Sequence, residues 1–162
     1  MKKIFFLFSI TVILSCSKEE VKLNESALST ISEGFVVWSG PTIEFVKESG
    51  ANPLETINQD QIAPSVSITR GNDGGQIYNI ILENKSEKDF SPLGTQWAIG
   101  DTSNLYNLTF GPFRTIVGRP QEVVGKKLVL HIMEENIYLS VEFTSWFQGQ
   151  NGGFSYKRST QN

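Results

Sequence analysis

The chain has 162 residues, of which 39% are hydrophobic, 11% aromatic and 19% charged, and its formal net charge is −3. This length is typical of a single domain. One Cys and one His exclude an internal disulfide framework, a thiolate zinc cluster and any site built on two imidazoles. The acidic balance argues against nucleic acid as the main partner, because phosphate recognition needs a clustered basic surface.

The first fifteen residues have the pattern of a secretory signal peptide. Lys2 and Lys3 precede an apolar run over residues 4–14, and this run is too short to span a bilayer, since a spanning helix needs about 20 residues. The run ends two residues before Cys16, the single cysteine of the chain. A plain secretory signal with an incidental cysteine, or a buried strand, is the alternative interpretation.

The residues Ile13-Leu14-Ser15-Cys16 resemble the lipobox of bacterial lipoproteins. The resemblance implies that Cys16 is acylated and becomes the mature N-terminus, so that the membrane is a partner through the lipid anchor. The following Ser17-Lys18-Glu19-Glu20 resembles the acidic export signal of Bacteroidota surface lipoproteins, which implies placement on the outer face of the outer membrane. We therefore expect a lipoprotein signal peptide at 1–15, a lipidated cysteine with a flexible tether at 16–33, and a folded domain at 34–162.

From residue 34 onward, short apolar runs alternate with turn residues, which is typical of an all-β domain. Strands are expected at 35–38, 42–47, 65–70, 76–83, 94–100, 105–110, 127–133, 137–146 and 154–158, and a short helix at 112–117. For residues 54–62, the pattern does not decide between a helical turn and other structure. The pattern predicts an antiparallel β-sandwich or jelly roll of about eight strands, with a flattened barrel as the alternative.

Four segments of this domain resemble a β domain found in secreted proteins of marine and gut bacteria. They are residues 38–41, 68–71, 143–146 and 152–160, and the resemblance extends over about 38–160. It implies an extracellular location and a β fold, and it attaches no activity to the domain.

Period-two alternation assigns the two faces of the strand at 137–146. The predicted core face carries Ile137, Leu139, Val141 and Phe143, and the opposite face carries Tyr138, Ser140, Glu142, Thr144 and Trp146. A two-residue turn at 135–136 would pair His131 with Ser140 on the neighbouring strand. His131 would then lie diagonal to Glu142, on the same face as Tyr138 and Trp146.

Aromatic rings mixed with carboxylate, imidazole and hydroxyl groups are the side chains that a sugar-binding sheet face needs. The candidate ligand contacts are Tyr138, Glu142, Trp146 and His131, together with Trp97. The sequence thus predicts a non-catalytic domain that binds a glycan or another surface ligand. The alternative is a half-covered sheet face on which Tyr and Trp exclude water and expose only a polar tip.

Two other functional classes remain open. In one, the domain is structural or binds a partner protein through an edge strand, with no small ligand. In the other, it is a small polysaccharide hydrolase or lyase built on Glu142 and His131, which requires a second carboxylate near Glu142. A nucleophilic triad is less favoured than either, because His131 is the single His, no Ser lies in a G-x-S-x-G motif and Cys16 is assigned to the lipid.

No cofactor is expected, although two loops carry oxygen ligands of the kind that structural Ca²⁺ uses. These are residues 58–60 and 72–74, with Asp60 and Asp73 as weak candidate ligands, and ordinary turn chemistry is the alternative. Three arginines, Arg70, Arg114 and Arg158, are expected to pair with acidic side chains at sheet ends.

Overall fold

The computed structural model describes residues 34–162; the predicted signal peptide, Cys16 and the predicted tether lie outside the described residues. The strands are β1 (Val36–Trp38), β2 (Ile43–Lys47), β3 (Asp60–Ala63), β4 (Val66–Arg70), β5 (Ile77–Asn79), β6 (Thr95–Ile99), β7 (Lys127–Ile132), β8 (Ile137–Trp146) and β9 (Phe154–Arg158). The helical segments of this range are the α-helix α1 (Phe113–Val117) and the 3₁₀ helices η2 (Thr56–Asn58), η3 (Thr102–Asn107) and η4 (Pro120–Glu122).

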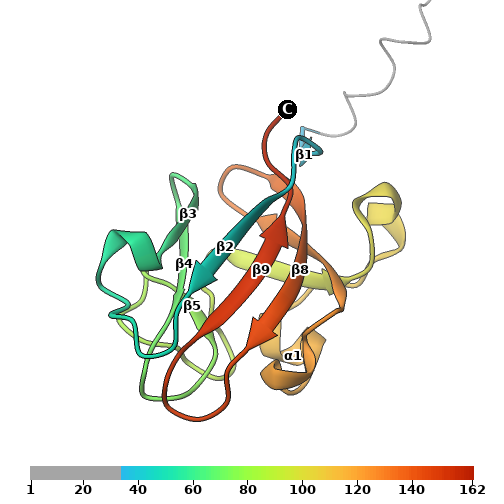
Figure 1. Cartoon of the computed structure of the whole chain (residues 1–162). Helices are drawn as coiled ribbons and strands as arrows, with labels where there is room; N and C mark the ends of the chain where they lie inside the picture. Colours follow the sequence, from blue (N-terminus) through green and yellow to red (C-terminus); the bar gives the residue numbers. More distant parts are fainter. Residues whose placement is uncertain (1–33) are drawn as a thin grey trace, which may run out of the picture. The chain divides into compact units, whose positions relative to one another are not determined.

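The nine strands form two sheets, which confirms the predicted all-β class and is consistent with a β-sandwich. The larger sheet has the order β2-β9-β8-β7-β6, and β1 pairs in parallel with the first part of β8. The smaller sheet has the order β3-β4-β5. Figure 1 shows β2, β9 and β8 side by side, with the smaller sheet next to them and the C-terminus close to β1.

Most of the predicted strands lie where the sequence places them, with two exceptions. The strand predicted at 105–110 is wrong, because residues 102–107 form the 3₁₀ helix η3. Asp101 precedes this helix and its side chain accepts a hydrogen bond from the Ser103 backbone N–H, which is the cap that favours a helical start. The strand predicted at 76–83 is shorter, since β5 ends at Asn79.

One core is shared by both sheets and α1. The predicted inward face of β8 is confirmed: Ile137, Leu139, Val141 and Phe143 are all buried. Phe143 lies at the centre of an aromatic cluster, with ring centroids between 5.3 and 6.4 Å from those of its neighbours. These neighbours are Trp97, Phe113, Trp146, Phe154 and Tyr156.

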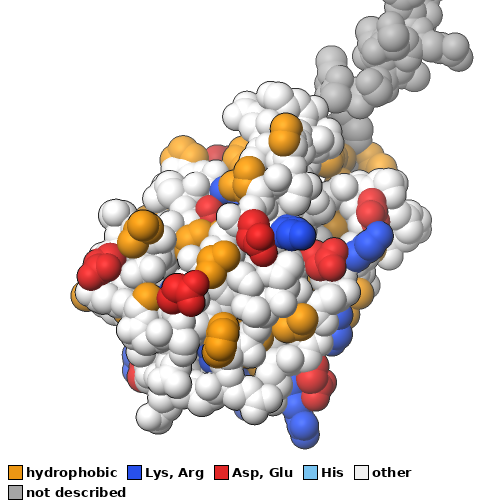
Figure 2. Space-filling model, viewed as in Figure 1, with side chains coloured by type: hydrophobic (Ala, Val, Ile, Leu, Met, Phe, Trp, Pro, Cys, Tyr) orange, Lys and Arg blue, Asp and Glu red, His pale blue; other side chains and the backbone are white. Residues whose placement is uncertain are grey.

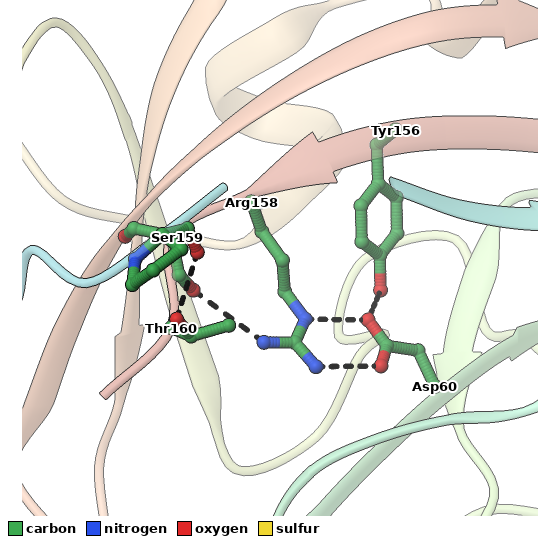
Figure 3. Close-up of polar contacts among 6 residues, drawn as sticks. Asp60, Tyr156, Arg158, Ser159 and Thr160 are labelled. Atoms are coloured by element: carbon green, nitrogen blue, oxygen red, sulfur yellow. Dashed lines mark hydrogen bonds and ion pairs between the residues drawn. The ribbon is translucent and has the colours of Figure 1, made fainter. Parts of the chain in front are cut away.

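A buried ion pair joins the two sheets (Figure 3). Arg158 on β9 holds Asp60 on β3 with two parallel hydrogen bonds, Nε to Oδ2 at 2.7 Å and Nη2 to Oδ1 at 2.8 Å. The Tyr156 hydroxyl donates a third hydrogen bond to Asp60 at 2.6 Å. Burial lowers the pKa of Arg158, but the hydrogen bonds to Asp60 and its charge raise it overall. The expected pairing of Arg158 with an acid is therefore confirmed.

Replacing Tyr156 with Phe is expected to make the fold less sensitive to alkali. Burial, then the charge of Asp60, raises the pKa of the Tyr156 phenol well above its usual value. Its contribution to stability is therefore complete below the unfolded pKa of about 10 and is lost as the pH rises toward the folded value. The free energy of unfolding should fall by up to about 1.4 kcal/mol per pH unit in this window, and less steeply in Tyr156→Phe. Urea unfolding between about pH 9 and pH 11 measures both slopes, and equal slopes would contradict the assignment.

Candidate functional site

A β-bulge redirects the end of β8. The pairing with β9 shifts between Phe143 and Ser145, so that Thr144 and Ser145 lie opposite the single residue Ser155. Both hydroxyls contact Ser155 Oγ, at 2.6 and 2.7 Å. An extra residue reverses the alternation beyond it, and bulges often redirect a side chain next to a functional site. Trp146 therefore packs against the core aromatics, and its predicted place beside Tyr138 is wrong.

Trp146 lines a pocket of about 290 Å³ at the end of β8. The pocket lies between the β4–β5 turn, α1, η4 and the loop that connects β8 to β9. Its lining residues are Arg70, Gly75, Arg114, Pro120, Gln121, Trp146, Gln148 and Gly149. Two arginines, two glutamines and one tryptophan give it a surface rich in hydrogen-bond donors.

Arg70 forms one wall of this pocket, although its side chain is only 2% exposed. Its Nη1 donates to the Phe147 carbonyl at 2.8 Å and to the Gly153 carbonyl at 2.9 Å, and its Nε donates to the Gly75 carbonyl. The guanidinium carbon lies 4.2 Å from the centre of a Trp146 ring, a cation–π contact. These contacts hold the β8–β9 loop and leave Nη2 without a hydrogen-bond partner among residues 34–162.

Lys47, the last residue of β2, places a second cation close to Arg70. Its side chain is fully buried, and its Nζ donates to Asn72 Oδ1 at 3.0 Å and to the Gly152 carbonyl at 3.3 Å. Burial lowers the pKa of Arg70 to about 10, and burial together with the charge of Arg70 lowers the pKa of Lys47. Within the described range, no carboxylate lies within ion-pair distance of either cation. The expected acidic partner of Arg70 is thus wrong, because backbone carbonyls take that place.

His131 and Tyr138 lie together, as expected, but in a different register. Residues 133–136 form a four-residue connection, so His131 pairs with Tyr138 rather than with Ser140. A two-residue type I′ turn at 135–136 would need positive φ at both residues, and only Asn136 has it, at 52°.

The His131 and Tyr138 rings are stacked, with centroids 4.1 Å apart, and Phe35 and Phe110 pack edge-on against Tyr138. Asn136 contacts His131 Nε2 at 2.9 Å and donates to the Gly34 carbonyl at 3.1 Å. Burial raises the pKa of Tyr138. These contacts give the His131 and Tyr138 rings a structural role: they support the chain where it enters β1.

Glu142 lies in a row of alternating charges on the outer face of the larger sheet. In the strand register, Glu44 pairs with Lys157, Lys157 with Glu142, and Glu142 with Lys127. Figure 2 shows acidic and basic side chains next to one another over these strands. All four side chains are exposed, and opposite charges on neighbouring strands stabilise a sheet by about 0.2–1 kcal/mol per pair.

The register also separates Glu142 from His131. Tyr138, the partner of His131, lies four residues before Glu142 on β8, which is about 13 Å along a strand. The expected proximity of Glu142 and His131 is therefore wrong. Glu44 lies two strands from Glu142, roughly 10 Å across the sheet, with Lys157 between them.

Two further candidates are occupied by internal contacts. Trp97 is 1% exposed and donates its Nε1–H to Thr95 Oγ1 at 2.9 Å, so it belongs to the core and not to a ligand surface. Both carboxylate oxygens of Asp60 accept hydrogen bonds from Arg158 or Tyr156, which corrects its assignment as a calcium ligand. Asp73 is exposed, and residues 34–162 contain no group of three or more His, Cys, Asp or Glu side chains arranged to hold a metal ion.

The pocket beside Trp146 contains residues that the sequence did not assign to a ligand. Arg70 and Arg114 carry charge but were expected in ion pairs, and Gln148 stands in a loop of Gly, Asn and Gln. The bulge brings Trp146 to them. The only sequence signal for it is the run Thr144-Ser145 in the middle of an alternating strand, which is weak.

Comparisons with protein-family models, with curated proteins and with solved structures find no match for this chain. Among the residues that the structure describes, no helix is both long and apolar enough to cross a membrane.

Proposed function

We propose that this protein is a surface lipoprotein whose β domain binds a glycan, without catalysis, in the pocket beside Trp146. The observation that carries the proposal is the re-aimed Trp146, whose indole lies among the planar polar side chains of Arg70, Gln121 and Gln148. An aromatic ring with a few convergent polar groups is the usual composition of a ligand site. The pocket volume of about 290 Å³ lies at the small end of ligand pockets and suits one sugar residue of a longer chain.

Non-catalytic binding is favoured over hydrolysis by the placement of the acids. No carboxylate lines the pocket beside Trp146, whereas a glycosidase needs two that flank the scissile bond. Glu142, the candidate acid, belongs to the exposed charged row on the outer face of the sheet. The proposed binding site and the candidate acid are thus in different places.

Trp146→Phe and Gln148→Ala are each expected to weaken glycan binding at least about fivefold, because they remove the indole N–H and a pocket amide. A polysaccharide array with the Cys16→Ala chain identifies the glycan. Isothermal titration then measures the affinity of each variant for that glycan. Tyr138→Ala is the matched control, since Tyr138 lies in the His131 cluster, and it should bind as the parent does. Loss of binding in Tyr138→Ala alone, or binding of no polysaccharide by the parent, would overturn the proposal.

A separate prediction concerns the proposed lipid anchor at Cys16, a residue that lies outside the described part of the chain. Cells expressing the chain should incorporate labelled palmitate into it, and Cys16→Ala should abolish the label. Several acyl chains on one residue anchor stably, because each buried CH₂ contributes about 0.8 kcal/mol. The variant should also move from the membrane fraction to the soluble fraction, while a Ser17→Ala control stays with the membrane. Continued labelling of Cys16→Ala would rule out this anchor.

A further inference from the structure

We propose that the pocket beside Trp146 recognises an anionic group, a carboxylate or a sulfate, carried by an acidic polysaccharide. This inference rests on the proposed glycan-binding function and specifies the class of glycan. Two hydrogen-bond donors among the residues that line the pocket have no partner in the described part of the chain. Arg70 Nη2 and Trp146 Nε1 donate to no residue of the described range.

Neither of these donors is completely buried, although Arg70 as a whole is only 2% exposed. Two buried side-chain atoms of the described residues lack a partner, Ser67 Oγ and Gln76 Oε1, and neither belongs to Arg70 or Trp146. The free nitrogens of Arg70 and Trp146 are therefore not sealed in the core. Since both residues line the pocket, their N–H groups are available to a molecule in it.

The charge of the pocket has one sign. Arg70 and Arg114 line the pocket, Lys47 lies close to Arg70, and no Asp or Glu is among the lining residues. A buried cation with no acidic partner is unfavourable unless other groups compensate for its lost hydration. For Arg70 the carbonyls of the β8–β9 loop supply part of this compensation, and a bound anion would complete it.

The pocket suits an oxyanion because the guanidinium of Arg114 can offer a pair of parallel N–H groups to carboxylate or sulfate oxygens. Arg70 adds the N–H groups of Nη2, since its Nε and Nη1 already donate to backbone carbonyls. The chain as a whole has a net charge of −3, so long-range attraction does not favour a polyanion. Selectivity for an acidic glycan would then arise within the pocket.

Isothermal titration with matched probe pairs tests whether the pocket prefers an anionic glycan to its neutral counterpart. Oligogalacturonate and its methyl ester differ only in the carboxylate charge, and a sulfated galactan oligosaccharide and its desulfated form differ only in the sulfate. The acidic member of at least one pair should bind about tenfold or more tightly than its neutral counterpart, the usual effect of a charge-assisted hydrogen bond. The preferred pair identifies the anionic group.

Arg114→Gln should remove most of this preference, and it leaves the Arg70 contacts with the loop in place. Arg119→Gln is the matched control, because Arg119 forms an exposed ion pair with Glu122 outside the pocket lining. Equal binding of acidic and neutral probes that stays sensitive to Trp146→Phe would overturn the anionic assignment and leave glycan binding intact. Acidic binding that Arg114→Gln and Arg119→Gln weaken equally would also overturn it. Binding of no oligosaccharide by the parent would overturn the proposed function itself.

Discussion

Asp60→Asn is expected to destabilise the fold by about 3–5 kcal/mol, because it leaves the guanidinium of Arg158 buried without its counter-charge. Both side chains are less than a tenth exposed, and the pair joins β3 to β9. The variant keeps the size of the carboxylate, so the loss reports charge and hydrogen bonding and not a cavity. Urea unfolding followed by tryptophan fluorescence measures the difference in the free energy of unfolding.

Glu122→Gln is the control for this measurement. It neutralises one partner of an ion pair with Arg119 whose side chains are 75% and 57% exposed, and such surface pairs contribute about 0–1 kcal/mol. If both substitutions changed stability by the same small amount, the Asp60–Arg158 pair would not stabilise the contact between the two sheets as the structure indicates.

Phe143→Ala is expected to destabilise the fold by a similar amount, about 3–5 kcal/mol, through the cavity that it leaves. Phe143 is fully buried and touches five aromatic rings from β6, α1, β8 and β9. It supports Trp146 directly, with ring centroids 5.8 Å apart. The same substitution should therefore also disturb the pocket.

Phe90→Ala is the matched control, since it removes the same atoms from a side chain that is 66% exposed. A change of less than about 0.5 kcal/mol is expected there. Equal destabilisation by Phe90→Ala and Phe143→Ala in urea would contradict the central place of Phe143 in the core.

The two strands β7 and β8 show which features of the fold can be predicted from local sequence pattern. Their inward faces follow from alternation, because side chains on a strand point to opposite sides with a period of two. The shift in register by two residues preserved those faces, so the predicted core residues of β8 were correct although its pairing with β7 was not. His131 and Tyr138 stayed on one face for the same reason.

The site depended on features that the alternation does not encode. The bulge at Thr144 and Ser145 moved Trp146 to the other face, and the four-residue turn separated Glu142 from His131. The bulge adds one residue to β8 relative to regular strand pairing, and the turn has two residues more than the predicted one. A count of apolar positions does not detect such an addition when the neighbours are small and polar.

By itself, the sequence determined the β class, the positions of most strands, the inward residues of β8 and the short helix at α1, because these follow from local periodicity and turn chemistry. Only the tertiary structure decided which polar groups meet. Arg158 finds Asp60 from 98 positions away, and Arg70 binds the Phe147 carbonyl from 77 positions away. Contacts at such separations depend on how the sheets pack and where each strand pairs, and these are global properties that no local window of sequence contains.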